Sequence, residues 1–140
     1  ELYVQLLQLL SKLALCQCQT LSELSFRDDI PTIHGTRMLQ IHEFVQQNFK
    51  RKVYLKEVAD LVRMSEQSFS RFFRKMMGRS FFTFLNEYRI NMAVRMLLDT
   101  DKSVSQIGYD CGYESLPFFY KQFNKYMGRT PLNHQKEYKN

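Results

Sequence analysis

Apolar residues recur at intervals of three and four positions along most of this chain. This spacing places side chains on one face of an α-helix, and no segment shows the sustained alternation of apolar and polar residues that indicates a strand. The sequence therefore predicts an all-α fold. The first helix of the main segment is expected to begin at Thr36 and to direct four side chains inward, namely Met38, Ile41, Val45 and Phe49. The helices that follow are expected at about 55–62, 66–77, 81–99, 104–111, 116–127 and 131–138.

Capping residues mark the ends of most of these helices. A Ser or Thr side chain can accept a hydrogen bond from a free N–H group at a helix N-terminus, and Gly readily ends a helix in the left-handed conformation. The expected N-caps are Ser65, Ser80, Ser103, Ser115 and Thr130, and the expected terminators are Gly78, Gly112 and Gly128. Ser103 and Gln106 also have the spacing of a capping box.

The first 36 residues differ from the rest. Residues 1–18 are expected to form an amphipathic helix with an apolar seam of Leu2, Leu6, Leu9 and Leu13. Two interpretations remain equally open: the seam packs on its own domain, or it mediates dimerisation as the remnant of a dimerisation or sensor region. Residues 19–36, with Pro31 and Gly35, are predicted to be a linker, so the main domain is expected at 37–140. Because the chain begins with Glu, we expect a fragment of a longer protein.

One sequence pattern occurs twice. FFRKMMGRS at 72–80 is matched by QFNKYMGRT at 122–130, an offset of 50 residues. Upstream the offset is 49, where Val62 matches Cys111 and Met64 matches Tyr113. A repeat at a fixed offset indicates that one supersecondary unit occurs twice. The second copy therefore has one added residue, at the position of the expected turn.

Each copy has a short helix, a tight turn and a longer helix, which is the helix-turn-helix pattern. The first motif is expected at about 55–78, the linking helix at about 81–99 and the second motif at about 104–128. A linking helix of about 19 residues is about 28 Å long. With the ends of the motifs added, it can place two recognition helices near the roughly 34 Å separation of successive major grooves. An ordinary helical hairpin is the competing interpretation, and it is the commoner one.

The longer helix of the first motif divides into an apolar and a polar face. Its expected core residues are Phe69, Phe72, Phe73 and Met76. Its expected DNA-binding residues are Gln67, Ser70, Arg71, Arg74 and Lys75. Gln and Arg can bond base edges in a major groove, and Arg matches the two acceptors of guanine. A solvated or phosphate-bound Arg71 is the plainer alternative.

The distribution of charge favours a polyanionic partner. Residues 37–140 hold 18 basic and 10 acidic residues, a net charge of +8, whereas residues 1–36 have a net charge of −2. A protein-interaction module is the main alternative to DNA binding. An enzyme is not expected, because His34, His42 and His134 are scattered singly and no nucleophile–base set or phosphate-binding loop accompanies them.

The cysteines and the apolar N-terminal stretch exclude several other classes. Cys16, Cys18 and Cys111 are an odd number without a paired framework, which favours a reducing compartment. Cys16 and Cys18 lack a second pair of ligands for zinc, so neither a metal nor a cofactor is expected. The stretch from Leu2 to Leu15 is too short and too polar to span a bilayer, so no membrane association is expected.

Residues 37–140 resemble the DNA-binding domain of the AraC/XylS family of bacterial transcription regulators. The second copy matches most closely, in Ser103 to Gly108, Cys111 to Tyr113, Phe119, Phe123, Lys125, Gly128, Thr130 and Pro131. The linking helix adds Tyr88, Arg89 and Ala93. The resemblance implies a cytoplasmic, nucleoid-associated regulator that inserts two recognition helices into successive major grooves of double-stranded DNA. It also implies RNA polymerase and a second copy of the chain as candidate partners.

The second motif departs from the family pattern. Its expected DNA-binding residues are Pro117, Phe118, Tyr120, Lys121 and Lys125. The family usually has polar residues and an Arg in this stretch, so base reading here is expected to depend on thymine methyl groups and phosphates. Gly108 stands where the family usually has Ala, which is expected to loosen its helix by roughly 0.5–1 kcal/mol.

Overall fold

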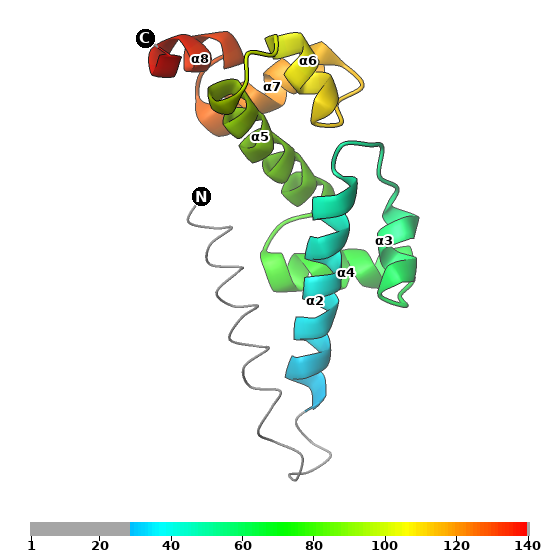
Figure 1. Ribbon diagram of the computed structural model, residues 1–140. Helices are drawn as coiled ribbons and strands as arrows, with labels where there is room; N and C mark the ends of the chain where they lie inside the picture. The colour runs from blue at the N-terminus through cyan, green and yellow to red at the C-terminus, as the bar shows by residue number, and fades with distance from the viewer. Residues whose placement is uncertain (1–28, 140) are drawn as a thin grey trace. The chain divides into compact units, whose positions relative to one another are not determined.

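The computed structural model describes residues 29–139, which form helices and contain no strand (Figure 1). The helices are α2 (Asp29–Asn48), α3 (Leu55–Leu61), α4 (Glu66–Met77), α5 (Phe81–Asp99), α6 (Val104–Asp110), α7 (Leu116–Met127) and α8 (Pro131–Lys139). None of these helices has the length and apolar content needed to cross a membrane. The predictions for residues 1–28, including the seam of Leu2, Leu6, Leu9 and Leu13, lie outside the described residues.

The chain divides into two compact units at the bond between Glu43 and Phe44, inside α2. In the first unit, α2 begins at Asp29, so the predicted helix start at Thr36 is wrong and residues 29–36 are helical rather than part of a linker. Pro31 is tolerated because the first N–H groups of a helix have no partner within it. Thr36 lies inside the helix and donates a hydrogen bond to the carbonyl oxygen of Thr32 (2.9 Å).

The second unit contains both predicted helix-turn-helix motifs, and local capping explains their boundaries. Ser65 and Ser80 accept hydrogen bonds from the N–H groups of Ser68 and Thr83, each at 3.2 Å. Ser103 does the same for Gln106 (3.2 Å), so the N-cap predicted there is confirmed. Helices α4, α5 and α7 have the bounds that the sequence predicts, and α3 and α6 differ by one residue at an end.

Aromatic side chains form the core between the motifs and α5. Phe69 and Phe73 are fully buried in α4, and their ring centroids lie 5.6 Å from that of Phe81 at the start of α5. Phe119 and Phe123 occupy the equivalent positions of α7 and are also fully buried. Helices α6, α7 and α8 all pack on α5, as Figure 1 shows, so the linking helix is the common support of both motifs.

Met76 is not a core residue, contrary to the prediction. Its side chain is 42% exposed, because it lies at the end of α4, beyond Phe73. Its counterpart in the second motif, Tyr126, is only half buried and donates a hydrogen bond to the carbonyl oxygen of Thr83 (3.3 Å). Phe72 is half buried rather than fully buried. The inward face of α4 is therefore narrower than the sequence pattern indicates.

The structural repeat extends beyond the two motifs. Arg79 forms an ion pair with Glu87, and 50 residues later Arg129 forms one with Glu137. Ser80 and Thr130 both cap the helix that follows. Helix α8 is thus a second, shorter copy of the first half of α5, a relation that the sequence comparison missed because few of the paired residues are identical.

His134 occupies the position in α8 that Phe84 occupies in α5. The Phe84 ring lies 5.6 Å from that of Phe73, and the His134 ring lies 5.7 Å from that of Phe123. His134 is 4% exposed, and its Nδ1 atom has no hydrogen-bond partner among the described residues. Burial lowers the pKa of His134, and the positive charge of Arg129 lowers it further.

We expect His134→Phe to stabilise the protein, and to do so more strongly at low pH. Removing an unsatisfied buried nitrogen should contribute about 1 kcal/mol near pH 8. Because the pKa of His134 is lower in the folded state, the unfolded chain binds the proton first, so the parent loses stability as the pH falls below about 6.5. The variant lacks this loss. The measurement is urea unfolding of both proteins from pH 5 to 8.

His42, whose pKa is also lowered by burial, is present in both proteins and cancels in the difference. A stability difference that is constant between pH 5 and 8 would show that His134 does not titrate differently in the folded state. A less stable variant at pH 8 would show that the aromatic position does not accept a phenyl ring.

Candidate nucleic-acid interface

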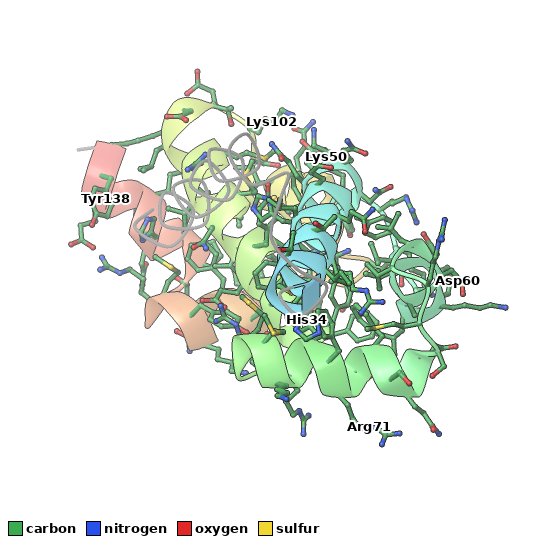
Figure 2. The ribbon with its side chains drawn as sticks, turned by 90° about the horizontal axis from the view of Figure 1, so that it is seen from below. His34, Lys50, Asp60, Arg71, Lys102 and Tyr138 are labelled. Carbon is green, nitrogen blue, oxygen red and sulfur yellow. The ribbon has the colours of Figure 1, made fainter. Side chains whose placement is uncertain are left out.

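Helix α4 presents a continuous polar face opposite its buried phenylalanines. All five predicted DNA-binding residues of the first motif, Gln67, Ser70, Arg71, Arg74 and Lys75, are exposed. Figure 2 shows the Arg71 side chain extending from α4 into open space. Glu66 is exposed on the first turn of the same helix, and sequence reasoning did not include it. The first motif therefore brings an amide, a hydroxyl and three cations together on one surface.

Helix α7 has a different surface on the same framework. Pro117, Phe118, Tyr120, Lys121 and Lys125 are all exposed, so the structure brings the predicted residues of the second motif together as well. Gln122, the only glutamine of this helix, is 9% exposed and turned toward the interior. The exposed face of α7 is therefore apolar and basic, with Asn124 as its one exposed amide.

The basic residues of both recognition helices are free of salt bridges between described residues, as are other exposed cations such as Lys56 and Lys136. Across residues 29–139, the salt bridges engage Arg51, Lys52, Arg79, Lys102, Arg129 and Lys139. None of them involves a basic residue of α4 or α7. An exposed cation without an acidic partner is available to a phosphate or a base edge. The cations of both recognition helices are thus available together.

The turn of each motif contains one residue in the left-handed conformation. In the first motif it is Arg63, with φ of 57°, and in the second it is Gly112, with φ of 86°. The residue inserted in the second motif is Glu114, which lies between Tyr113 and the N-cap Ser115 and forms a salt bridge with Lys52 (3.8 Å). The sequence predicted a helix end at Gly112. It did not predict the left-handed conformation of Arg63, because arginine rarely adopts that conformation.

Gly112 and Gly108 both permit close approaches between segments. A Cβ atom on Gly112 would lie 2.2 Å from the carbonyl oxygen of Phe49, so a side chain there would exclude the end of α2. A Cβ atom on Gly108 would lie 2.8 Å from Cδ1 of Phe119 and 3.1 Å from Cδ2 of Leu116. Gly108 therefore allows α6 and α7 to approach closely. This close packing is a reason for glycine at this position despite its unfavourable helix propensity.

Arg89, in the linking helix α5, connects the segment before the first motif to the turn of the second. Its Nε atom donates a hydrogen bond to the carbonyl oxygen of Phe49 (2.8 Å), and Nη2 donates to the carbonyl oxygen of Arg51 (2.7 Å). Its guanidinium carbon also lies 5.6 Å from the ring centroid of Tyr113. The side chain is buried, which lowers its pKa, but arginine remains protonated in proteins. The end of α2 and the turn of the second motif are thus held to one cation.

A cavity of about 370 Å³ lies beside Arg89, between α5, the segment at 52–53 and the turn of the second motif. Lys52, Phe82, Asn86, Tyr113 and Phe118 contribute to its lining. The Phe118 ring lies 6.0 Å from the ring of Tyr113, so this side chain occupies the edge of α7 next to the cavity. Tyr120 and Lys121 do not line the cavity and lie on the exposed surface of the helix.

Cys111 is a buried structural residue. Burial raises the pKa of its thiol to about 12, and its sulfur lies 3.8 Å from that of Met96. The thiol is therefore protonated at neutral pH and unsuited to nucleophilic chemistry. Cys16 and Cys18 lie outside the described residues.

Comparison with known proteins gives a consistent set of matches. Residues 58–137 match a family described as "Helix-turn-helix domain". The chain is 25% identical over 109 residues to the uncharacterized HTH-type transcriptional regulator YdeC of Bacillus subtilis. The aligned residues cover 78% of this chain and 38% of that protein. It is 29% identical over 97 residues to the melibiose operon regulatory protein of Escherichia coli, covering 69% of this chain and 32% of that protein.

Solved structures show the same fold. The C-terminal domain of AraT, a response regulator from Geobacillus stearothermophilus, has a TM-score of 0.68 at 25% identity and covers 72% of this chain and 84% of that one. The DNA-binding domain of AdpA, solved with a target DNA, has a TM-score of 0.69 at 22% identity over 74% of this chain and 92% of that one. The chain spans less than half the length of the curated relatives described above.

We expect Arg89→Met to destabilise the protein by about 2–4 kcal/mol, because two carbonyl groups lose charged hydrogen-bond donors. The matched control is Arg95→Met, which removes an exposed arginine from the same helix and should change stability by less than about 0.5 kcal/mol. Urea unfolding measures both values. Equal stabilities of the two variants would show that the hydrogen bonds of Arg89 to Phe49 and Arg51 do not stabilise the fold.

Proposed function

Because the chain belongs to the AraC/XylS family of helix-turn-helix transcription regulators, we propose that its two motifs bind double-stranded DNA with α4 and α7 in successive major grooves. The observation that carries this proposal is the set of cations on α4 and α7 that take part in no salt bridge between described residues. These cations are Arg71, Arg74, Lys75, Lys121 and Lys125. The 19-residue helix α5 that joins the motifs supports simultaneous binding by one chain.

We assign unequal roles to the two recognition helices. Gln67, Ser70, Arg71 and Arg74 of α4 supply the hydrogen-bonding base contacts, and Lys75 contacts phosphate. On α7, Lys121 and Lys125 contact phosphates. Arg71 is the strongest candidate for a guanine contact, because its guanidinium can donate two parallel hydrogen bonds to O6 and N7. RNA polymerase contact and dimerisation through the seam at residues 1–18 stay predictions, as does action in the cytoplasm at the bacterial nucleoid.

Binding of the 140-residue chain to duplex DNA should weaken steeply with salt. Neutralising about five phosphates releases about four to five counterions, so affinity should fall about 500-fold between 50 and 200 mM salt. Fluorescence anisotropy titrations over this range measure the slope. A protein-interaction module that associates through apolar side chains would bind with little salt dependence. Absence of DNA binding at 50 mM salt, or a flat salt dependence, would contradict the proposal.

Arg71→Ala should weaken binding to a site selected from random duplexes by about 1–3 kcal/mol and relax the preference at one base pair. Arg71→Lys keeps the charge but cannot donate the paired hydrogen bonds, so the preference should also relax. Lys121→Ala should weaken all sequences about equally. Titrations of single-base variants of the site measure these effects. Full recovery by Arg71→Lys would identify Arg71 as a phosphate contact, and altered base preference in Lys121→Ala would reverse the assigned roles.

A further inference from the structure

The two recognition helices can be compared position by position, because their N-caps Ser65 and Ser115 are offset by 50 residues. Pro117 occupies the position of Gln67, and Tyr120 occupies that of Ser70. Phe118 occupies the position of Ser68, whose hydroxyl is 3.0 Å from that of Ser65 within the N-cap of α4. Three exposed positions that carry polar side chains on α4 therefore carry a proline or an aromatic ring on α7.

We propose that α7 selects thymine through the C5-methyl group, with Pro117 and Tyr120 as the contacting residues. This inference rests on the proposed DNA binding and specifies which base the second motif reads. Thymine is the only base that presents a methyl group in the major groove. An exposed apolar side chain can recognise that group by excluding water from it, without a hydrogen bond.

The polar groups needed to read the other bases are scarce on α7. Guanine is read by Arg or Lys; α7 has no Arg, and its two lysines are the residues assigned above to phosphates. Adenine is read by Asn or Gln; Gln122 is buried, and the exposed Asn124, at the position of Arg74, is the one amide of α7 available for adenine. Pro117 has no N–H group to donate in the first turn of the helix. Where Pro117 and Tyr120 lie, the base feature that an apolar surface can distinguish is the thymine methyl group.

The apolar surface is also rigidly held. The Tyr120 ring centroid lies 5.8 Å from that of Phe119, in an edge-to-face arrangement, and Phe119 is fully buried. Tyr120 is 37% exposed, so part of its ring stays available for contact. A proline and a supported ring lose little conformational freedom on binding, which favours contact with a small group.

Charge favours DNA over a protein as the occupant of this surface. Helix α7 contains no acidic residue, and Lys121 and Lys125 are exposed on it. The phosphate groups that flank a thymine in the groove match these cations. A neutral apolar partner would gain nothing from them.

The test is to replace each thymine of the selected site, one at a time, with deoxyuridine, which removes only the C5-methyl group. For a thymine contacted by α7, affinity should fall about fourfold, the equivalent of about 0.8 kcal/mol for one buried methyl group. In Tyr120→Ser, which places the residue of the first motif at this position, the fourfold penalty should disappear at the thymine that Tyr120 contacts. Tyr120→Phe should retain it, and Pro117→Ala should reduce it at a neighbouring thymine.

Matched controls separate this inference from the proposed function. Lys121→Ala should weaken binding but keep the deoxyuridine penalty, and Ser70→Ala in the first motif should leave the penalty unchanged. Circular dichroism confirms that each variant is folded. A penalty that is the same in Tyr120→Ser as in the parent, or the absence of any penalty in the parent, would overturn thymine reading while leaving DNA binding intact. A parent protein that binds no duplex would overturn the proposed function itself.

Discussion

The buried guanidinium of Arg89 is the interaction that holds the linking helix α5 to the segment before the first motif and to the turn of the second. A buried cation is unfavourable unless its donors are paired, and here the pairing groups are backbone carbonyls at the end of α2. The ring of Tyr113, in the turn of the second motif, covers the same cation. Three segments distant in sequence therefore share one charge. Gly112 completes the contact, because no Cβ atom fits between that turn and Phe49.

The second copy of the repeat ends in a weaker version of this contact. Lys139 lies 50 residues after Arg89 and donates a hydrogen bond to the carbonyl oxygen of Thr100 at the end of α5 (2.7 Å). It is exposed and also pairs with Asp101 (3.3 Å). Arg89 of α5 thus contacts the backbone just after α2, and Lys139 of α8 contacts the backbone just after α5. Of these two cations, only Arg89 is buried, and only Arg89 also contacts the turn of the second motif through Tyr113. Lys139 is exposed, and its hydrogen bonds within the described residues go to the end of α5 and Asp101.

Much of the fold could be predicted from sequence, because helix ends depend on local chemistry. Ser65, Ser80 and Ser103 each cap the helix that follows. Features that depend on tertiary contacts were missed: the burial of Arg89 and the likeness of α8 to α5. The start of α2 at Asp29 was missed because Pro31 reads as a break even in a first turn, where it is tolerated. The exposure of the predicted interface residues could be inferred from the helical periodicity of the sequence. Their contacts with DNA depend also on the base sequence of the partner, so these contacts stay predictions.

The close contact between Gly112 and the end of α2 also has a consequence for operators. The packing of α4 and α7 on the one helix α5, together with this contact, leaves little freedom to change the spacing or the relative twist of α4 and α7. A duplex whose half-sites are out of phase must then bend or twist to fit, at an energy set by the stiffness of its intervening steps. The base pairs between the two half-sites, which touch no side chain, would consequently be selected for flexibility. Their sequence would then contribute to the specificity of binding.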